Sequence, residues 1–260
     1  MCQEYLYPET VRETVDLLAR WSGQALIVAG GTDLVLQLKR SERRAACLID
    51  VSRIEAMRRI KESGGAITLG AAVTHAEAAA APILQAAVPV LVLAASEVGS
   101  PEIRNVATIG GNVVNAQPAA DTALALLALE AEAEVVGAGG ARWMPLLDLY
   151  GGAGVSAVDS TAELVTRFRF QVPVGQVGSA YRRLGKCKSI ALPVLCAATV
   201  VRLEADRVVS AAIGLGPVAP VPFRPREAEQ WIAGQPATAE TIMQAAALAQ
   251  EEAQPRDSLL

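Results

Sequence analysis

"LIVAGGTDL", residues 26–34, places two adjacent glycines directly after a run of branched apolar residues and follows them with a hydroxyl and a carboxylate. The apolar run predicts a buried strand. A chain that only has to turn can do so with a single glycine. Two in a row after a strand therefore indicate that something approaches the backbone closely. A second glycine pair lies in "ATIGGN", residues 107–112, and we expect the two pairs to belong to one site.

Both stretches have features that suit a diphosphate. Its oxygens bind best to converging backbone N–H groups, which glycine leaves accessible because it has no Cβ and tolerates positive φ. A following helix start adds further unpaired N–H groups. Thr32 and Thr108 supply hydroxyls, and Asn112 supplies an amide. Each pair alone predicts a tight turn, whereas the two together favour one shared anion. Asp33 is expected to face away from that anion and to cap the next helix.

Composition excludes several classes of protein. The 23 basic and 27 acidic residues are mixed along the chain, so no basic stripe indicates nucleic-acid binding. Four scattered cysteines, at positions 2, 47, 187 and 196, predict reduced and partly buried thiols rather than disulfides or a metal site. The N-terminus lacks a signal-peptide pattern, and no window reaches the roughly 18 uninterrupted apolar residues of a membrane span. We therefore expect a soluble cytoplasmic protein.

Periodicity and caps predict mixed helices and strands. Thr10 with Glu13, and Thr74 with Glu77, fit capping boxes at two helix starts. The expected elements are helices at 11–21, 34–40, 82–98 (one, or two short ones) and from 121; strands at 25–29 and 46–51; hairpins around 64–65 and within 132–145; a strand at 164–172; an antiparallel sheet over 179–216; and two helices at 226–233 and 239–253. Residues 99–121 are expected to be a long irregular segment, and loops of that length are usually functional.

Two further glycine motifs are expected to be loops. "GAGVSA", residues 152–157, matches a loose dinucleotide-binding pattern, but it lacks a clear strand–turn–helix context and an acidic residue about 20 positions on. "GLGPVA", residues 214–219, runs into prolines that prevent a helix. Neither motif supports a Rossmann fold.

With these stretches identified, nearly the whole chain resembles the FAD-binding subunit of the molybdenum hydroxylases, a family that includes the flavin subunits of aerobic carbon monoxide dehydrogenase and of bacterial xanthine dehydrogenase. The stretches that carry the resemblance are "YLYPETVRETVDLL", "AGGTDL", "LIDVSRI", "ITLGAAVTHAE", "GSPEIRNVATIGGNVVNAQPAAD", "SAYRRLG" and "IGLGPVAPVPFRPREAE". The resemblance implies an α+β fold. An FAD-binding domain of the PCMH or vanillyl-alcohol-oxidase type would occupy 1–174, with α/β subdomains at about 1–56 and 57–174. A small domain at 175–260, similar to the carbon monoxide dehydrogenase flavoprotein C-terminal domain, would carry an antiparallel sheet and helices.

The resemblance also assigns site residues. The diphosphate would be wrapped by Val28, Ala29, Gly30, Gly31, Thr32, Asp33 and Leu34, and closed over by Ala107, Thr108, Ile109, Gly110, Gly111 and Asn112. Asp121 would bond ribityl or ribose hydroxyls, Val98 would lie in the flavin pocket, Leu164 or Val165 would pack near the ring system, and Arg182 or Arg183 would be the basic residue near the flavin. The only histidine, His75, is expected to be solvated and distant from both glycine stretches, so FAD would bind non-covalently.

By this resemblance the chain relays electrons and needs no catalytic acid or base and no metal of its own. Molybdopterin would lie in a large subunit and [2Fe–2S] clusters in a small one, in a dimer of heterotrimers, and FAD would pass electrons to NAD+, a quinone or another acceptor. One alternative is a free-standing FAD-dependent reductase of the same fold. Another is a scaffold whose glycine pairs are only turns. The family pattern continues beyond Leu260, so the chain is either naturally short or truncated.

Overall fold

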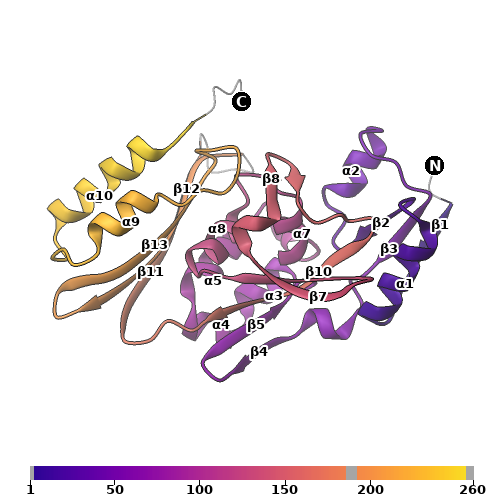
Figure 1. Cartoon of the computed structure of the whole chain (residues 1–260), viewed down its shortest axis with the longest axis horizontal. Coiled ribbons are helices and arrows are strands. Elements are labelled where there is room, and N and C mark those ends of the chain that lie inside the picture. The colour runs from indigo at the N-terminus through magenta and orange to yellow at the C-terminus, as the bar shows by residue number, and fades with distance from the viewer. Residues whose placement is uncertain (1–2, 186–191, 256–260) are drawn as a thin grey trace.

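The computed structural model describes residues 3–185 and 192–255. Three structural units follow one another along the long axis of the molecule, with the N-terminal unit at the right of Figure 1 and the C-terminal unit at the left. Each unit is built around its own sheet. The arrangement confirms the predicted α+β fold.

The N-terminal unit is a parallel sheet in the order β1-β3-β2, with two helices. Its elements are β1 (Glu4–Leu6), α1 (Val11–Trp21), β2 (Ala25–Val28), α2 (Leu34–Lys39) and β3 (Cys47–Asp50). As predicted, α1 begins after Thr10, whose hydroxyl accepts the backbone N–H of Glu13. Leu18 of α1 packs with Ile49 of β3 in a small buried cluster. Since β2 is buried and ends at Val28, the first glycine pair emerges at the carboxyl edge of this sheet.

The middle unit contains a five-stranded sheet in the order β4-β5-β10-β6-β7, in which every pairing is antiparallel. Its elements are β4 (Ile60–Ser63), β5 (Ala66–Gly70), α3 (His75–Ala80), α4 (Pro82–Ala87), α5 (Pro89–Glu97), α6 (Pro101–Arg104), α7 (Ile109–Val114), α8 (Asp121–Ala128), β6 (Glu132–Gly137), β7 (Gly140–Pro145), β8 (Tyr150–Gly152), β9 (Val155–Ser156) and β10 (Glu163–Gln171). Both predicted hairpins are present. Phe168 of β10, Leu91 of α5 and Leu124 of α8 are fully buried in one core, which joins the helices to the sheet.

The expectation of a long irregular segment at 99–121 is wrong. The segment 99–121 is not a continuous irregular loop, because it contains α6 and α7. Each of these short helices has a side-chain cap: the Ser100 hydroxyl accepts the N–H of Ile103, and the Thr108 hydroxyl accepts the N–H of Gly111. The glycines and the proline in the segment obscured these caps.

The C-terminal unit is the expected antiparallel sheet, in the order β11-β12-β13, with two helices. Its elements are β11 (Gln176–Gly185), β12 (Pro193–Glu204), β13 (Arg207–Gly216), α9 (Arg226–Ile232) and α10 (Ala239–Glu252). The end of β13 lies directly on the middle unit. A Cβ on Gly214 would be 2.4 Å from the carbonyl oxygen of Leu124, and one on Gly216 would be 2.0 Å from that of Pro118. The glycines of "GLGPVA" thus allow two backbones to touch.

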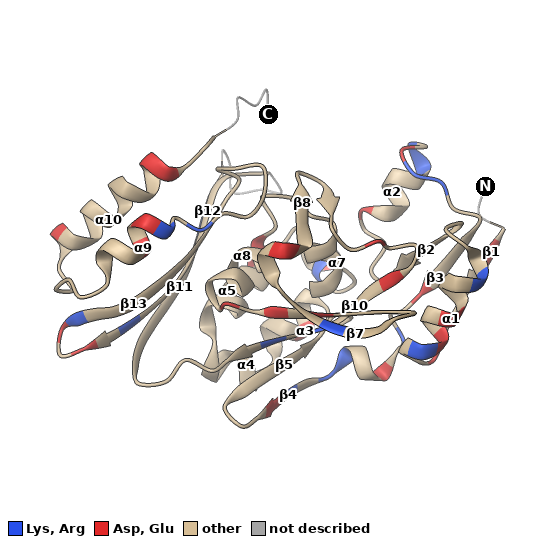
Figure 2. Cartoon of the chain, viewed as in Figure 1, with Lys and Arg blue, Asp and Glu red and all other residues tan. Residues whose placement is uncertain are grey.

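The distribution of surface charge and the state of the described cysteines agree with what the composition predicted. Figure 2 shows acidic and basic positions interspersed, apart from a short basic stretch just after α2. Cys47 and Cys196 are free and buried, whereas Cys2 and Cys187 lie outside the described residues. Within the described part of the chain, no helix is long and apolar enough to cross a membrane.

Candidate cofactor site

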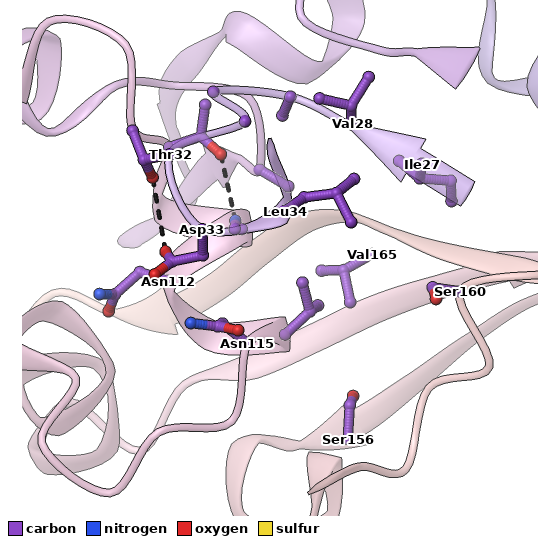
Figure 3. A pocket seen from close by; sticks show the side chains of 18 of the residues that line it. Ile27, Val28, Thr32, Asp33, Leu34, Asn112, Asn115, Ser156, Ser160 and Val165 are labelled. Atoms are coloured by element: carbon purple, nitrogen blue, oxygen red, sulfur yellow. Dashed lines mark hydrogen bonds between the residues drawn. The ribbon is translucent and has the colours of Figure 1, made fainter. Parts of the chain in front are cut away.

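A cleft of about 740 Å³ opens between the N-terminal and middle units. Small-molecule and cofactor sites usually measure about 300–1,000 Å³. Three stretches supply most of its lining: the β2–α2 turn, the segment from the end of α5 through α7, and the segment from the β8–β9 turn into β10. The structure therefore brings the two glycine stretches to one cavity (Figure 3).

The two stretches touch through Gly30. A Cβ on this residue would lie 2.2 Å from the carbonyl oxygen of Val106 and 2.8 Å from Cα of Ala107, so only glycine fits there. Its neighbour Gly31 has a different role, because its φ of +69° provides the left-handed turn that leads into α2. Gly30 allows the two walls of the cleft to contact each other, and Gly31 changes the direction of the backbone before α2.

The β2–α2 turn presents a run of backbone donors. The N–H groups of Gly30, Gly31, Thr32 and Asp33 have no acceptor among the described residues, and all four residues line the cleft. Successive outward N–H groups of this kind form an anion-binding concavity. This is the feature that the sequence predicted for the first stretch.

The expected side-chain cap by Asp33 is wrong. Asp33 occupies the position before α2, but its backbone is helical (φ −97°, ψ −47°) and its carboxylate accepts no cap hydrogen bond. A capping side chain needs an extended backbone at that position. The carboxylate instead lies in the cleft lining, where Thr32 Oγ1 donates to it at 3.5 Å (Figure 3).

The second stretch does not offer the open backbone donors that its glycines predicted. Its amides are used within the protein: Ile109 N–H donates to Val73 O (2.9 Å), Gly110 N–H to Ala71 O (2.8 Å), Gly111 N–H to Thr108 Oγ1 (3.1 Å) and Asn112 N–H to Thr108 O (3.0 Å). Here α7 packs against the chain that follows β5. A Cβ on Gly110 would be 2.7 Å from the carbonyl oxygen of Ala71, so this glycine is required for the packing and not for an anion.

Side-chain amides replace those backbone donors. Asn112 and Asn115 are three residues apart around α7, so both reach the same face, and Figure 3 places both across the cleft from the Thr32–Asp33 turn. Asn112 Oδ1 accepts the Thr122 hydroxyl at 2.7 Å and the Ala123 N–H at 3.3 Å. These bonds fix the amide and leave its NH₂ group as the part available to a ligand.

Part of the remaining lining is apolar. Val98 at the end of α5, and Leu164 and Val165 in β10, are less than a tenth exposed and line the cleft. Ala29, Leu34 and Ala107 also line it, whereas Ile109 is fully buried in the core and does not. Apolar walls beside a set of hydrogen-bond donors are the composition of a site for a ligand with both rings and charges.

Comparison with known proteins identifies the family. Residues 1–174 match the family described as "FAD binding domain in molybdopterin dehydrogenase", and residues 179–259 match "CO dehydrogenase flavoprotein C-terminal domain". The chain belongs to the FAD-binding subunits of the molybdenum hydroxylases. It is accordingly an oxidoreductase component, and the resemblance inferred from the sequence is confirmed.

Individual relatives are similar over most of their length. The nicotinate dehydrogenase FAD-subunit of Eubacterium barkeri is 30% identical over 92% of this chain and 82% of that protein. The carbon monoxide dehydrogenase medium chain of Afipia carboxidovorans is 31% identical over 95% of this chain and 85% of that protein. A solved structure of carbon monoxide dehydrogenase from Hydrogenophaga pseudoflava has a TM-score of 0.94 at 30% identity, covering 100% of this chain and 90% of that one.

Besides Ile109, three residues that the resemblance assigned to FAD lie outside the lining of the cleft in this flavoprotein subunit. Asp121, at the start of α8, accepts hydrogen bonds from the Tyr181 hydroxyl and from the Cys196 thiol (3.6 Å), and Arg183 Nε is 3.5 Å away. Burial raises the pKa of Asp121, although Tyr181 and Arg183 oppose that shift. Arg182 Nη1 donates to the carbonyl oxygen of Tyr181 at 3.4 Å. The described contacts of Asp121 and Arg182 thus lie with the C-terminal sheet, and their contact with FAD stays a prediction.

The expectation for His75 is wrong. This side chain is 1% exposed and lines the cleft, and its backbone N–H donates to the carbonyl oxygen of Ala107 at 3.1 Å. The predicted capping box is present, with Thr74 and Glu77 bonded reciprocally. The cap was correctly identified from the sequence, but the docking of this helix start against the second glycine stretch was not.

Sequence reasoning also missed polar residues on the far side of the cleft. Ser156 and Ser160 come from the β8–β9 hairpin and the loop after it, and Arg43 comes from the chain after α2. Arg43 Nη2 donates to Ser160 Oγ at 3.2 Å, which links the N-terminal and middle units. Ser156 lies within "GAGVSA", so the one available signal was the motif expected to be only a loop.

Proposed function

We propose that the cleft binds FAD non-covalently, with the diphosphate at the N–H groups of Gly30 to Asp33. This proposal rests on the run of four open donors in a turn whose first glycine, Gly30, contacts the second glycine stretch. The cleft's volume and mixed lining support the same conclusion, because FAD joins two ring systems through a charged bridge.

The residues present suit each part of the cofactor. Asn112 and Asn115 add donors on the side opposite the diphosphate turn, and Val98, Leu164 and Val165 offer apolar surface for a ring and exclude water from it. Asp33 is an acceptor, so it suits a hydroxyl of the cofactor better than a phosphate. When bound, FAD supplies the capacity to accept and hand on electrons.

The chain would receive electrons from a [2Fe–2S] small subunit, which obtains them from a molybdopterin large subunit, and pass them to NAD+, a quinone or another acceptor. The assembly would be a dimer of heterotrimers. The names of the relatives support a multi-subunit complex, since several are called medium chains or FAD-subunits. Residues 1–174 and 175–260 would act as the flavin domain and the C-terminal domain of this relay, and Asp121 with Arg182 or Arg183 would meet FAD at their junction.

Substitution of Gly111 tests the site. A Cβ there would meet only the Thr108 hydroxyl, at 3.0 Å, so a Gly111→Leu chain is expected to fold and to project its side chain into the cleft. The wild-type chain, purified from a flavin-sufficient host, should be yellow with one FAD per chain, and the variant should be colourless with an unchanged circular dichroism spectrum.

Gly139→Leu is the matched control, because a Cβ on that glycine meets nothing within 4 Å. It should keep its flavin. A Gly111→Leu chain that still carried one FAD would show that the second stretch is not at the diphosphate. A wild-type chain unable to bind FAD would overturn the proposed function as a whole.

A further inference from the structure

The side chain of His75 contains two buried polar atoms, its ring nitrogens Nδ1 and Nε2. Neither Nδ1 nor Nε2 has a hydrogen-bond partner among the described residues. Buried polar groups in folded proteins are almost always hydrogen-bonded. Because His75 is among the residues that line the cleft, a ligand bound there is the candidate partner for one of these nitrogens.

The imidazole is held uncharged. Burial and the nearby Arg104 guanidinium lower the pKa of His75 to about 4. Arg104 itself is engaged with the end of α5, where Nη1 donates to Val98 O at 3.0 Å and to Gly99 O at 3.3 Å. A neutral imidazole has one N–H donor and one acceptor nitrogen. It can therefore form one hydrogen bond to an acceptor of a ligand and one from a donor.

The hydrogen-bonding groups of His75 suit some parts of FAD better than others. The diphosphate offers only acceptors, and the open donors of the β2–α2 turn already suit it. The edges of the adenine and of the isoalloxazine ring each carry both a donor and acceptors. Val98, which lines the same cleft, is an apolar surface on which such a ring can lie.

We propose that His75 is a cofactor-binding residue that hydrogen-bonds the edge of one heteroaromatic ring of FAD through its side chain. The proposal rests on the proposed function, because it takes FAD to be the ligand of the cleft. It adds a specific contact that neither glycine stretch provides and gives one of the unsatisfied nitrogens a partner.

The single histidine of the chain makes a direct test possible. Histidine labelled with ¹⁵N in the ring gives one imidazole spin system in the flavin-free chain. Addition of FAD should move the resonances of both ring nitrogens. Addition of ADP or of FMN alone should reproduce the shift for whichever ring His75 meets. Unmoved ring resonances in a chain shown by its absorbance to have bound FAD would overturn the proposal.

Two variants give an independent readout. His75→Leu should raise the Kd for FAD about tenfold, the scale of one or two lost neutral hydrogen bonds, while the Tm of the flavin-free chain stays the same or rises, because no polar atom is then left unsatisfied. His75→Gln retains a donor and an acceptor and should recover most of the affinity.

The outcomes separate the two proposals. If the wild-type chain does not bind FAD, the proposed function fails. If the wild-type chain binds FAD and His75→Leu binds it equally well, only the role of His75 is overturned. A Leu variant with a lower flavin-free Tm and an unchanged Kd would show that the ring has a packing role alone. The ring resonances of the wild-type chain decide the question even if His75→Leu does not fold.

Discussion

At the scale of single residues, burial of uncharged His75 makes the stability of the flavin-free chain depend on pH. Its folded pKa is about 4 against an ordinary value of 6.5, so between these values the unfolded chain binds more protons than the folded one. The free energy of unfolding should therefore fall as the pH drops from 6.5 to 4, by up to about 3 kcal/mol from this residue. Urea unfolding at pH 7 and pH 4.5 measures the change.

His75→Leu is the control for that measurement, because it removes this titration and leaves those of the carboxylates. The difference in unfolding free energy between wild type and variant should grow in the variant's favour toward pH 4. Parallel pH profiles for the two proteins would show that the imidazole is not held uncharged in the folded state.

The glycines illustrate what residue identity alone can predict. The sequence predicted that both pairs belong to one site, and the structure brings them to one cleft. The sequence alone could not distinguish Gly30 and Gly110, which permit close backbone contact, from Gly31, which permits a left-handed turn. All three look alike in the sequence, because what distinguishes them is the backbone that packs against each one.

At the scale of elements, a buried ion cluster joins α9 to the rest of the molecule. Arg224 donates to both carboxylate oxygens of Glu229, at 2.8 and 2.9 Å, and to Glu130 at 2.8 Å. Glu229 also accepts the backbone N–H of Ile213 in β13. Arg224→Met leaves the buried Glu229 with only the half-exposed Arg226, at 3.3 Å, as a counter-charge. It should destabilise the chain by about 3 kcal/mol, the low end for breaking a buried ion pair.

Chemical denaturation measures this loss, and Arg12→Met is the matched control. Arg12 pairs with Asp16 on the exposed face of α1, where both side chains are more than half exposed. Removing such a pair should cost no more than about 0.5 kcal/mol. Equal effects for the two variants would mean that the cluster around Arg224 contributes no more than a surface pair.

Local patterns predicted most elements but not the way they pair. Helix 11–21, the two hairpins and the C-terminal sheet follow from caps, turn residues and alternation, which are local signals. The five-stranded sheet inserts β10 between β5 and β6, so its neighbours are far apart in sequence. The same topology brings Ser156 and Ser160 to the cleft. Those contacts could not be predicted because no local pattern encodes which strand lies next to which.

At the scale of the whole molecule, we expect the chain to be one component of a larger assembly. A tag on this chain, expressed in its native host, should recover two further proteins, one with [2Fe–2S] clusters and one with molybdopterin. Native mass spectrometry should give a mass that corresponds to two copies of each. The full-length chain alone should oxidise no small substrate.

Recovery of the chain alone, with flavin and with activity on a small substrate, would contradict this expectation and favour a free-standing reductase. Recovery with both partners as a single heterotrimer would support the electron relay but show that the assembly contains one copy of each subunit, not two. The two results are separable by mass, so one experiment addresses both the partners and their number.

The contact between Arg43 and Ser160 has a practical consequence. Arg43 lies in the exposed basic stretch 39–44, which both borders the cleft and contains several bonds that trypsin cleaves. A ligand that spans the two walls should restrain this stretch, and the ligand-free chain should be cut there faster. Resistance to limited digestion at these arginines should therefore measure, on a gel and without any spectroscopic signal from the flavin, what fraction of a preparation contains the ligand.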